Sequence, residues 1–363
     1  MVQEKLNRLH IALLIFNTQT GIVLLTLPRT TAKYFGTNGW ASILIVFLFV
    51  TIDIMLMNLV YRLGRGASVF EIMKSSLPKL VLYPIYILIG SLFAMIGCLV
   101  IKQYAMIYQI LIFPSTPDIL LKIVVDILVF LLVIKGIYTI SKANVFFALF
   151  LFIQFPIALY FVPSFEFARL TPFLFQGGTD MKEGFIRVFG AFMGYEAVLF
   201  LFPHAETNNK WLKYVHLGNG LTTFIYLLIT LESYGFYNVI ELTHMAFPIL
   251  EMYSFVSLAF VERMQNFLYS FLILSILQTG AMYYWTSQSI FRQIFPRIPA
   301  KLSIFVIMTV TITIAFIPKS LAEVEDWFRY LTIAEICFSI SFPPLLIILV
   351  IIQRRKAKRA KST

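Results

Sequence analysis

Charged residues are scarce in this sequence. Only 13% of its 363 residues are charged, whereas soluble domains usually carry about 25%. Hydrophobic residues make up 60% of the chain. A soluble protein of this size could not bury that much apolar surface, but a bilayer accommodates it because lipid is itself an apolar solvent. The low charge therefore excludes an ordinary soluble domain, and we expect an integral membrane protein.

The residues that build catalytic, metal or disulfide sites are also few. The two cysteines, Cys98 and Cys337, lie within apolar stretches, where a small buried hydrophobic residue is the ordinary interpretation. The four histidines show no metal-ligand spacing, and no phosphate-binding loop, paired zinc motif or serine–histidine constellation is present. We therefore expect no enzymatic activity, no catalytic residues, no metal and no cofactor.

The chain does contain many apolar stretches long enough to cross a bilayer. A spanning helix needs about 20 predominantly apolar residues. Such stretches occur near 10–33, 39–61, 82–112, 118–135, 143–162, 184–202, 214–232, 265–291, 302–317 and 331–352. We predict an all-α membrane protein with about ten transmembrane helices that form a single transmembrane domain over residues 1–363.

Lysine and arginine are distributed unevenly between the two sides that ten spans define. Nineteen fall on the side of the termini and seven on the opposite side. Because loops rich in Lys and Arg remain in the cytoplasm, both termini are predicted to be cytoplasmic. This distribution explains the net charge of +11 without nucleic acid as a partner. The basic tail, residues 353–363, is expected to bind anionic lipid headgroups.

Two spans are interrupted by polar and glycine residues. The first contains the sequence NTQTG at residues 17–21, and the sixth contains GAFMGYE at residues 190–196. Glycine lowers the cost of leaving helical geometry, and amide or hydroxyl side chains can satisfy the freed backbone groups. A broken helix presents unpaired N–H groups on one half and unpaired carbonyls on the other, so it can hold a carboxylate and an ammonium.

The positions of these interruptions indicate an internal repeat. Spans one and six correspond if the chain consists of two five-helix halves, repeat one at about 10–162 and repeat two at about 184–352. Interrupted helices at corresponding positions are typical of a transporter binding site near the bilayer midplane. The alternative, in which the glycines only permit close helix packing, remains open.

Ionisable residues within spans form a second group of candidates. They are Asp53, Lys102, Asp126, Glu196 and Glu335. Each is costly in a membrane without a partner, and Lys102 is the one basic residue well inside a span. We expect Lys102 to pair with Glu196 or Asp126, either as a charge relay or as a structural pair.

Several polar and aromatic residues could line a small pocket. They are Tyr104, Tyr108, Gln278, Thr279, Tyr283 and Tyr284, although each is individually more often a packed or interfacial residue.

A further helix is predicted over residues 247–261, after the seventh span. Its mixed apolar and polar spacing indicates an outer-surface helix, which could be a lid or a plain interfacial helix.

Four sequence strings resemble a known family. They are NTQTGIVLLTLPR in the first span, STPD before the fourth, GYEAVLFLFP in the sixth and FVERMQNF before the eighth. Their order resembles that of the spore germination permease-like proteins, the B subunits of GerA-type nutrient receptors, within the amino acid–polyamine–organocation superfamily. The resemblance covers essentially the whole chain and implies a five-plus-five inverted repeat with helices one and six broken.

The resemblance also implies a function. It places the chain in the inner membrane of a spore, acting with A-type and C-type receptor subunits to sense an amino acid or a similar nutrient. Ligand would contact the two breaks at Thr18, Thr20, Gly21, Ile22, Gly190, Phe192, Gly194, Tyr195 and Glu196.

Three interpretations of the pocket follow. The chain could be a sensing subunit, a proton-coupled amino acid transporter, or a scaffolding subunit whose pocket is vestigial. The fold expectation supports the first two equally, because both require a central site and two conformations. The resemblance favours the sensor.

Overall fold

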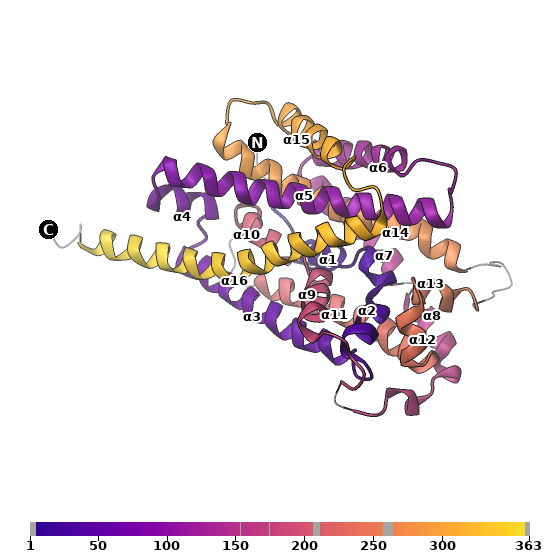
Figure 1. Cartoon of the computed structure of the whole chain (residues 1–363). Coiled ribbons are helices and arrows are strands. Elements are labelled where there is room, and N and C mark those ends of the chain that lie inside the picture. Colours follow the sequence, from indigo (N-terminus) through magenta and orange to yellow (C-terminus); the bar gives the residue numbers. More distant parts are fainter. Residues whose placement is uncertain (1–4, 153, 174, 206–210, 257–263, 360–363) are drawn as a thin grey trace.

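The protein is built almost entirely of helices. A computed structural model describes residues 5–152, 154–173, 175–205, 211–256 and 264–359, and this part of the chain contains no β-strand beyond two isolated bridges (Figure 1). Five of the described helices are long and apolar enough to cross a bilayer, and a bent pair, Met181–Ala191 with Tyr195–His204, makes up to six. The remaining predicted spans correspond to helices that are broken, shorter or more polar.

The first half of the chain contains five predicted spans in the expected order. Its elements are α1 (Arg8–Gln19), η1 (Ile22–Leu25), α2 (Leu27–Phe35), α3 (Ala41–Leu63), α4 (Val69–Ser76), α5 (Lys79–Leu111), α6 (Asp118–Val133), α7 (Ile137–Leu151), α8 (Gln154–Phe161), η2 (Val162–Ser164) and η3 (Phe167–Leu170). The first span is divided into α1 and α2, as predicted. The fifth span begins at Ile137, earlier than expected, because Gly136 turns the chain at a φ of 84°.

The second half repeats this order. Its elements are α9 (Met181–Ala191), η4 (Tyr195–Ala197), α10 (Val198–Leu201), η5 (Phe202–His204), α11 (Leu212–Phe236), α12 (Val239–His244), α13 (Pro248–Tyr253), α14 (Met264–Ile294), α15 (Ala300–Ile314) and α16 (Leu321–Arg359). The sixth span is divided at η4, as predicted, and bends by 50° there.

Two predicted boundaries in this half differ from the structure. Helix α16 begins at Leu321 rather than near 331, because Ser320 accepts a bond from Glu323 N, and Glu323 Oε2 accepts one from Lys319 N. The same helix continues into the basic tail as far as Arg359. The single helix predicted over 247–261 is limited to α13, while residues 257–263 lie outside the described chain.

The contacts between helices repeat when the two halves are exchanged. Helix α1 packs on α11 and α7, and its counterpart α9 packs on α3 and α16. Likewise α5 packs on α6 and α15, while its counterpart α14 packs on α15 and α6. The central contact, α5 with α14, joins the equivalent helices of the two halves. The chain is thus a five-plus-five repeat.

The central α5–α14 contact depends on small residues. A Cβ atom at Gly97 would lie 2.9 Å from Tyr283 Cβ, and one at Gly280 would lie 2.8 Å from Ile101 Cδ1. Small residues allow helix backbones to approach closely in membranes, where no hydrophobic effect draws helices together. This seam holds α14 beside the two breaks.

Helix α3 shows how the outside of the bundle differs from its inside. Val46 and Val50 are fully buried, whereas Leu48 and Ile52 on the opposite face are 59% and 57% exposed. Large exposed apolar side chains on a spanning helix are suited to contact with lipid. The protein is therefore an integral membrane protein.

Candidate functional site

The first break lies between α1 and η1 and is satisfied by hydroxyl groups from α14. Helix α1 ends at Gln19, which leaves backbone carbonyls without helical partners. Ser275 donates to the carbonyl of Thr20 and also lies 2.8 Å from Asn17 Oδ1. Thr279 donates to the carbonyl of Thr18 at 3.1 Å. Neutral side chains thus replace the missing helical hydrogen bonds.

The second break lies between α9 and η4 and is closed by a carboxylate. Gly194 has a φ of 120°, a conformation that favours glycine. Its N–H faces the Glu196 carboxylate, with distances of 2.7 and 2.9 Å to the two oxygens. The Tyr283 hydroxyl donates to Glu196 Oε1 at 3.0 Å. Glu196 itself is fully buried.

The two breaks are joined directly. Gln19 Nε2 donates to the carbonyl of Phe192 at 2.8 Å. The Tyr226 hydroxyl on α11 lies 2.7 Å from the carbonyl of Gln19 and 2.8 Å from that of Ala191, so one hydroxyl is shared between the breaks. Thr222 donates to Gln19 Oε1 at 2.9 Å and fixes the orientation of the amide. A movement of either break would therefore disturb the hydrogen bonds of the other.

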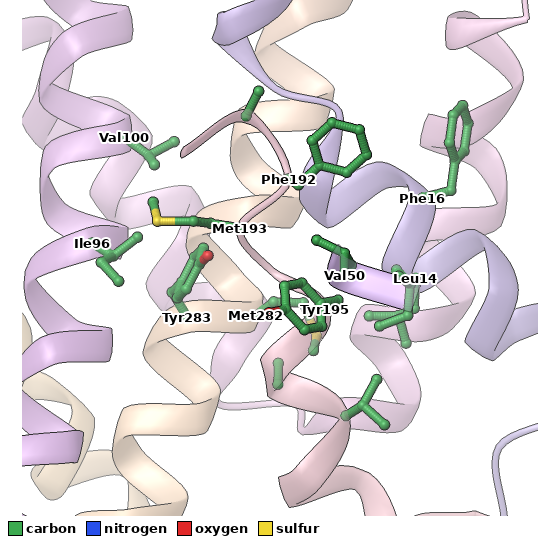
Figure 2. Packing of buried hydrophobic residues seen from close by; sticks show 14 of the residues in the cluster. Leu14, Phe16, Val50, Ile96, Val100, Phe192, Met193, Tyr195, Met282 and Tyr283 are labelled. Carbon is green, nitrogen blue, oxygen red and sulfur yellow. The ribbon is translucent and has the colours of Figure 1, made fainter. Parts of the chain in front are cut away.

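Figure 2 shows the packing around this junction. Phe192 and Met193 of the second break lie between the α5 residues Ile96 and Val100 on one side and Phe16 of α1 on the other. The two breaks approach closely: a Cβ atom on Gly194 would lie 2.7 Å from Thr18 Cγ2 and 3.2 Å from the Thr18 carbonyl carbon.

A small cavity lies between the breaks, and we call it the central cavity. Its volume is about 30 Å³. A water molecule occupies roughly 10–15 Å³ by this measure, so the central cavity has room for about two waters. It is lined by Thr18, Gln19, Gly21, Ile22, Val23, Ile96, Val100, Gln103, Gly190, Met193, Thr279, Tyr283 and Phe328. In this conformation the site is closed around a space smaller than an amino acid.

The predicted ligand-contact residues fall into two groups. Four line the central cavity: Thr18, Gly21, Ile22 and Gly190. The other five, Thr20, Phe192, Gly194, Tyr195 and Glu196, build the breaks or their surroundings without lining the cavity. The role of all nine residues in ligand binding stays a prediction.

The candidates from the polar and aromatic group divide in the same way. Thr279 and Tyr283 line the central cavity. The remaining four, Tyr104, Tyr108, Gln278 and Tyr284, do not line it.

Sequence reasoning missed the contribution of α11. Asn219, Thr222 and Tyr226 lie on one face of this helix and contact Gln19 or its carbonyl. Their separations of three and four residues match one face of a helix, and all three lie within the seventh predicted span. That periodicity was the available signal.

The predicted pairing of Lys102 is wrong. Lys102 bonds to Asp118, which lies in the first turn of α6 next to the end of α5. Asp126 is taken by Lys122, one turn away on α6, at 2.5 Å. Glu196 instead caps Gly194. Each of the three side chains has a different partner, so Lys102, Asp126 and Glu196 do not form a relay in this structure.

A different group of acidic residues surrounds η4. Asp53 of α3 and Glu335 of α16 both lie within electrostatic range of Glu196. All three are at least nine-tenths buried. Ser339 donates to Glu335 Oε1 at 3.3 Å. Asp53 lies close to the Tyr195 hydroxyl, but within the described chain neither group has a partner in hydrogen-bond geometry. Within the described residues, none of these three carboxyls forms an ion pair.

Comparison with protein families places the chain clearly. The sequence model of a family described as "Spore germination protein" matches residues 5–324. Spore germination protein A2 of Bacillus subtilis (strain 168) is 26% identical over 291 residues, which covers 77% of this chain and 78% of that protein. Spore germination protein GerQB of Bacillus cereus is 21% identical over 272 residues, 75% of each chain.

Solved structures share the fold at low sequence identity. MhsT in complex with L-phenylalanine is similar with a TM-score of 0.66 and 14% identity, over 96% of this chain and 89% of that one. Mhp1, a nucleobase-cation-symport-1 transporter in a closed conformation with bromovinylhydantoin bound, gives a TM-score of 0.65 and 14% identity, over 96% and 78%. These likenesses concern the fold alone, and they match the five-plus-five arrangement with helices one and six broken.

Proposed function

The chain belongs to the spore germination protein family, and from this membership we propose that it is the nutrient-sensing B subunit of a spore germinant receptor. The proposed ligand is a small nutrient, an amino acid in the first instance, that binds between the two broken helices. The proposal assigns the chain no catalysis.

One observation carries this proposal: the two breaks face each other across the central cavity and share hydrogen bonds. Backbone groups freed at the breaks can bind a carboxylate and an ammonium, which are the two charged groups of an amino acid. Ligand groups at this point would compete with the Gln19 and Tyr226 contacts that hold the breaks together. Binding would therefore alter the relative position of the two halves.

The small size of the central cavity supports a sensing role. A site of about 30 Å³ must widen before a nutrient can enter. A ligand that binds the wider form shifts the equilibrium between the two forms by its difference in affinity. This change of shape would be the signal passed to partner subunits.

We also infer that the chain acts with partner subunits in a particular membrane. A chain with so little sequence outside its helices needs other subunits to report a signal, and we assign this role to A-type and C-type receptor subunits. We place the chain in the spore inner membrane with both termini in the cytoplasm, on the excess of Lys and Arg on that side.

The test fills the central cavity with one side chain. At Gly21 a Cβ atom would have no neighbour closer than 3.9 Å, so Gly21→Val adds volume to the cavity without a clash at Cβ. Gly220→Val is the matched control, since a Cβ there meets nothing within 4 Å and Gly220 does not line the cavity. We expect spores with Gly21→Val to need at least about tenfold more nutrient for half-maximal germination, which corresponds to about 1.4 kcal/mol of binding free energy. An unchanged nutrient response at normal protein level would overturn the assignment of this site.

A second candidate function is proton-coupled amino acid transport, and the carboxyl group cluster around η4 favours it. Acidic residues that are buried in a membrane protein without basic partners are characteristic of proton pathways. Uptake of labelled amino acid into proteoliposomes that contain this chain alone, lost in Glu196→Gln, would support transport. Absence of uptake by a chain that binds the same amino acid would support sensing.

A further inference from the structure

A second hollow adjoins the central cavity and is larger. Its volume is about 150 Å³, room for roughly ten waters. We call it the vestibule, and its lining comes from η1, Thr26, α2, α9, α16 and one residue of α5. It shares Val23, Gln103, Gly190 and Phe328 with the central cavity, so the two spaces have a common wall. A ligand on its way to the breaks from this end would pass through the vestibule.

The vestibule carries an excess of positive charge. Four basic side chains line it, Arg29 and Lys33 from α2, Arg187 from α9 and Arg329 from α16, against a single lining acid, Glu325. Concave sites lined by one sign of charge concentrate small ions of the opposite sign.

Two of these cations are already held by an acid beside the vestibule. Glu183 accepts bonds from Arg187 at 2.9 Å and from Arg329 at 2.6 Å, and Glu325 lies 4.0 Å from Arg187. The Arg187 guanidinium also lies 5.6 Å from the ring centroid of Tyr34. These contacts fix the two arginines in the wall of the vestibule and engage both Glu183 and Glu325.

The other two cations have no such partner. Within the described chain, neither Arg29 nor Lys33 forms an ion pair, and both side chains belong to the lining. Lys33 lies over the ring of Tyr34 at 5.4 Å. Arginine presents a planar fork of N–H donors that matches a carboxylate, and Arg29 supplies it in the vestibule lining.

We propose that the vestibule is a binding site for small carboxylates, in which Arg29 and Lys33 receive the carboxylate group of a nutrient before it reaches the central cavity. The identity of the ligand as a nutrient rests on the proposed function, whereas carboxylate binding by the vestibule does not. A free carboxylate is the occupant we favour over a lipid headgroup, because the vestibule shares a wall with the cavity between the breaks.

Thiol chemistry tests this proposal and does not depend on which nutrient binds. Thr30 lines the vestibule between the two free cations and is replaced by cysteine in a Cys337→Ser background, since Cys98 is buried. The full chain, in nanodiscs of neutral phosphatidylcholine, is treated at low salt with an anionic or a cationic methanethiosulfonate reagent. The control is Ser164→Cys, an exposed position in η2 outside the vestibule.

We expect the ratio of anionic to cationic reaction rates to be about tenfold higher at Thr30→Cys than at the control. Adding Arg29→Gln and Lys33→Gln should bring the ratio towards the control value, whereas Lys182→Gln, an exposed cation outside the vestibule, should not change it. Equal ratios at the two cysteines would overturn the proposal.

Protection experiments identify the bound group. Sodium acetate should slow the anionic reagent at Thr30→Cys more than an equal concentration of sodium chloride, and equal slowing would mean screening only and overturn the site. L-alanine should protect and L-alaninol, which lacks the carboxylate, should not; equal protection by both would overturn carboxylate recognition. If acetate protects while Gly21→Val leaves germination unchanged, the proposed function fails and the carboxylate site stands.

Discussion

The two breaks have the same place in their halves of the chain but different chemistry. The first is satisfied by neutral hydroxyl groups of Ser275 and Thr279, and a Cβ atom on Gly21 would find free space. The second is held by the Glu196 carboxylate, and a Cβ atom on Gly194 would clash with Thr18. The two halves of this chain therefore share the position of the interruption but stabilise it with different groups. Under the proposed function, the first break would admit the ligand and the second would fix the geometry around it.

The largest expected effect comes from exchanging the two glycines for alanine. Gly194→Ala combines a positive φ with a Cβ contact of 2.7 Å, so we expect a loss of about 3 kcal/mol or more in the free energy of unfolding. Gly21→Ala should cost less than about 1 kcal/mol, since the nearest neighbour of its Cβ lies at 3.9 Å. Thermal unfolding of both purified variants provides the measurement. Equal losses would erase the distinction between the breaks.

Removal of the carboxylate at the second break ranks next. Glu196→Ala leaves the Gly194 N–H and the Tyr283 hydroxyl unpaired in a buried site, at a cost of about 2–3 kcal/mol. Glu196→Gln retains an acceptor oxygen and should recover at least half of this loss. Unfolding curves in the same detergent compare the two variants. If the Glu196→Gln and Glu196→Ala variants are equally destabilised, the negative charge rather than the hydrogen bonds stabilises the break.

A smaller effect is expected where the breaks are joined. Tyr226→Phe removes the hydroxyl shared by the carbonyls of Gln19 and Ala191, which should cost about 1–2 kcal/mol. Because the two carbonyls belong to different breaks, hydrogen exchange should increase at α1 and α9 together. Faster exchange on one helix alone would show that the breaks move independently.

The smallest effect lies away from both breaks. Lys102→Met keeps the apolar contacts of the Lys102 stem, whose side chain is 4% exposed, and removes the partner of Asp118. Because the Asp118 side chain is 22% exposed and stays in contact with water, we expect a cost of about 1 kcal/mol. The double variant Lys102→Met/Asp118→Asn should regain part of this stability, whereas Lys102→Met/Glu196→Gln should not. Rescue by Glu196→Gln would instead support the predicted pairing of Lys102 with Glu196, which the structure contradicts.

Much of the fold follows from local features of the sequence. The order of the spans and the places of both breaks were predictable, because apolar length and runs such as residues 17–21 act through neighbouring residues. The α16 start was not predicted, although its signal, Ser320 with Glu323, is also local. The prediction searched for long apolar stretches, and the helix cap lies in the polar sequence before such a stretch.

The site was only partly predictable. The glycines of both breaks were found, but the shared hydroxyl of Tyr226 and the acids Asp53 and Glu335 beside Glu196 were not assembled. Each of these contacts joins residues from different helices. Composition names such residues as candidates, but it does not say which face of each helix meets which.

The sequence by itself determined that this protein lies in a membrane, where its spans fall and where two of them break, since these properties depend on short stretches of chain and on the apolar solvent. Only the tertiary structure decided that Lys102 binds Asp118, that α11 joins the breaks, and that four cations meet at the vestibule. The reason is physical. A buried polar group takes whichever partner the packing brings within reach, and packing in a bundle of helices joins residues that are far apart in the chain.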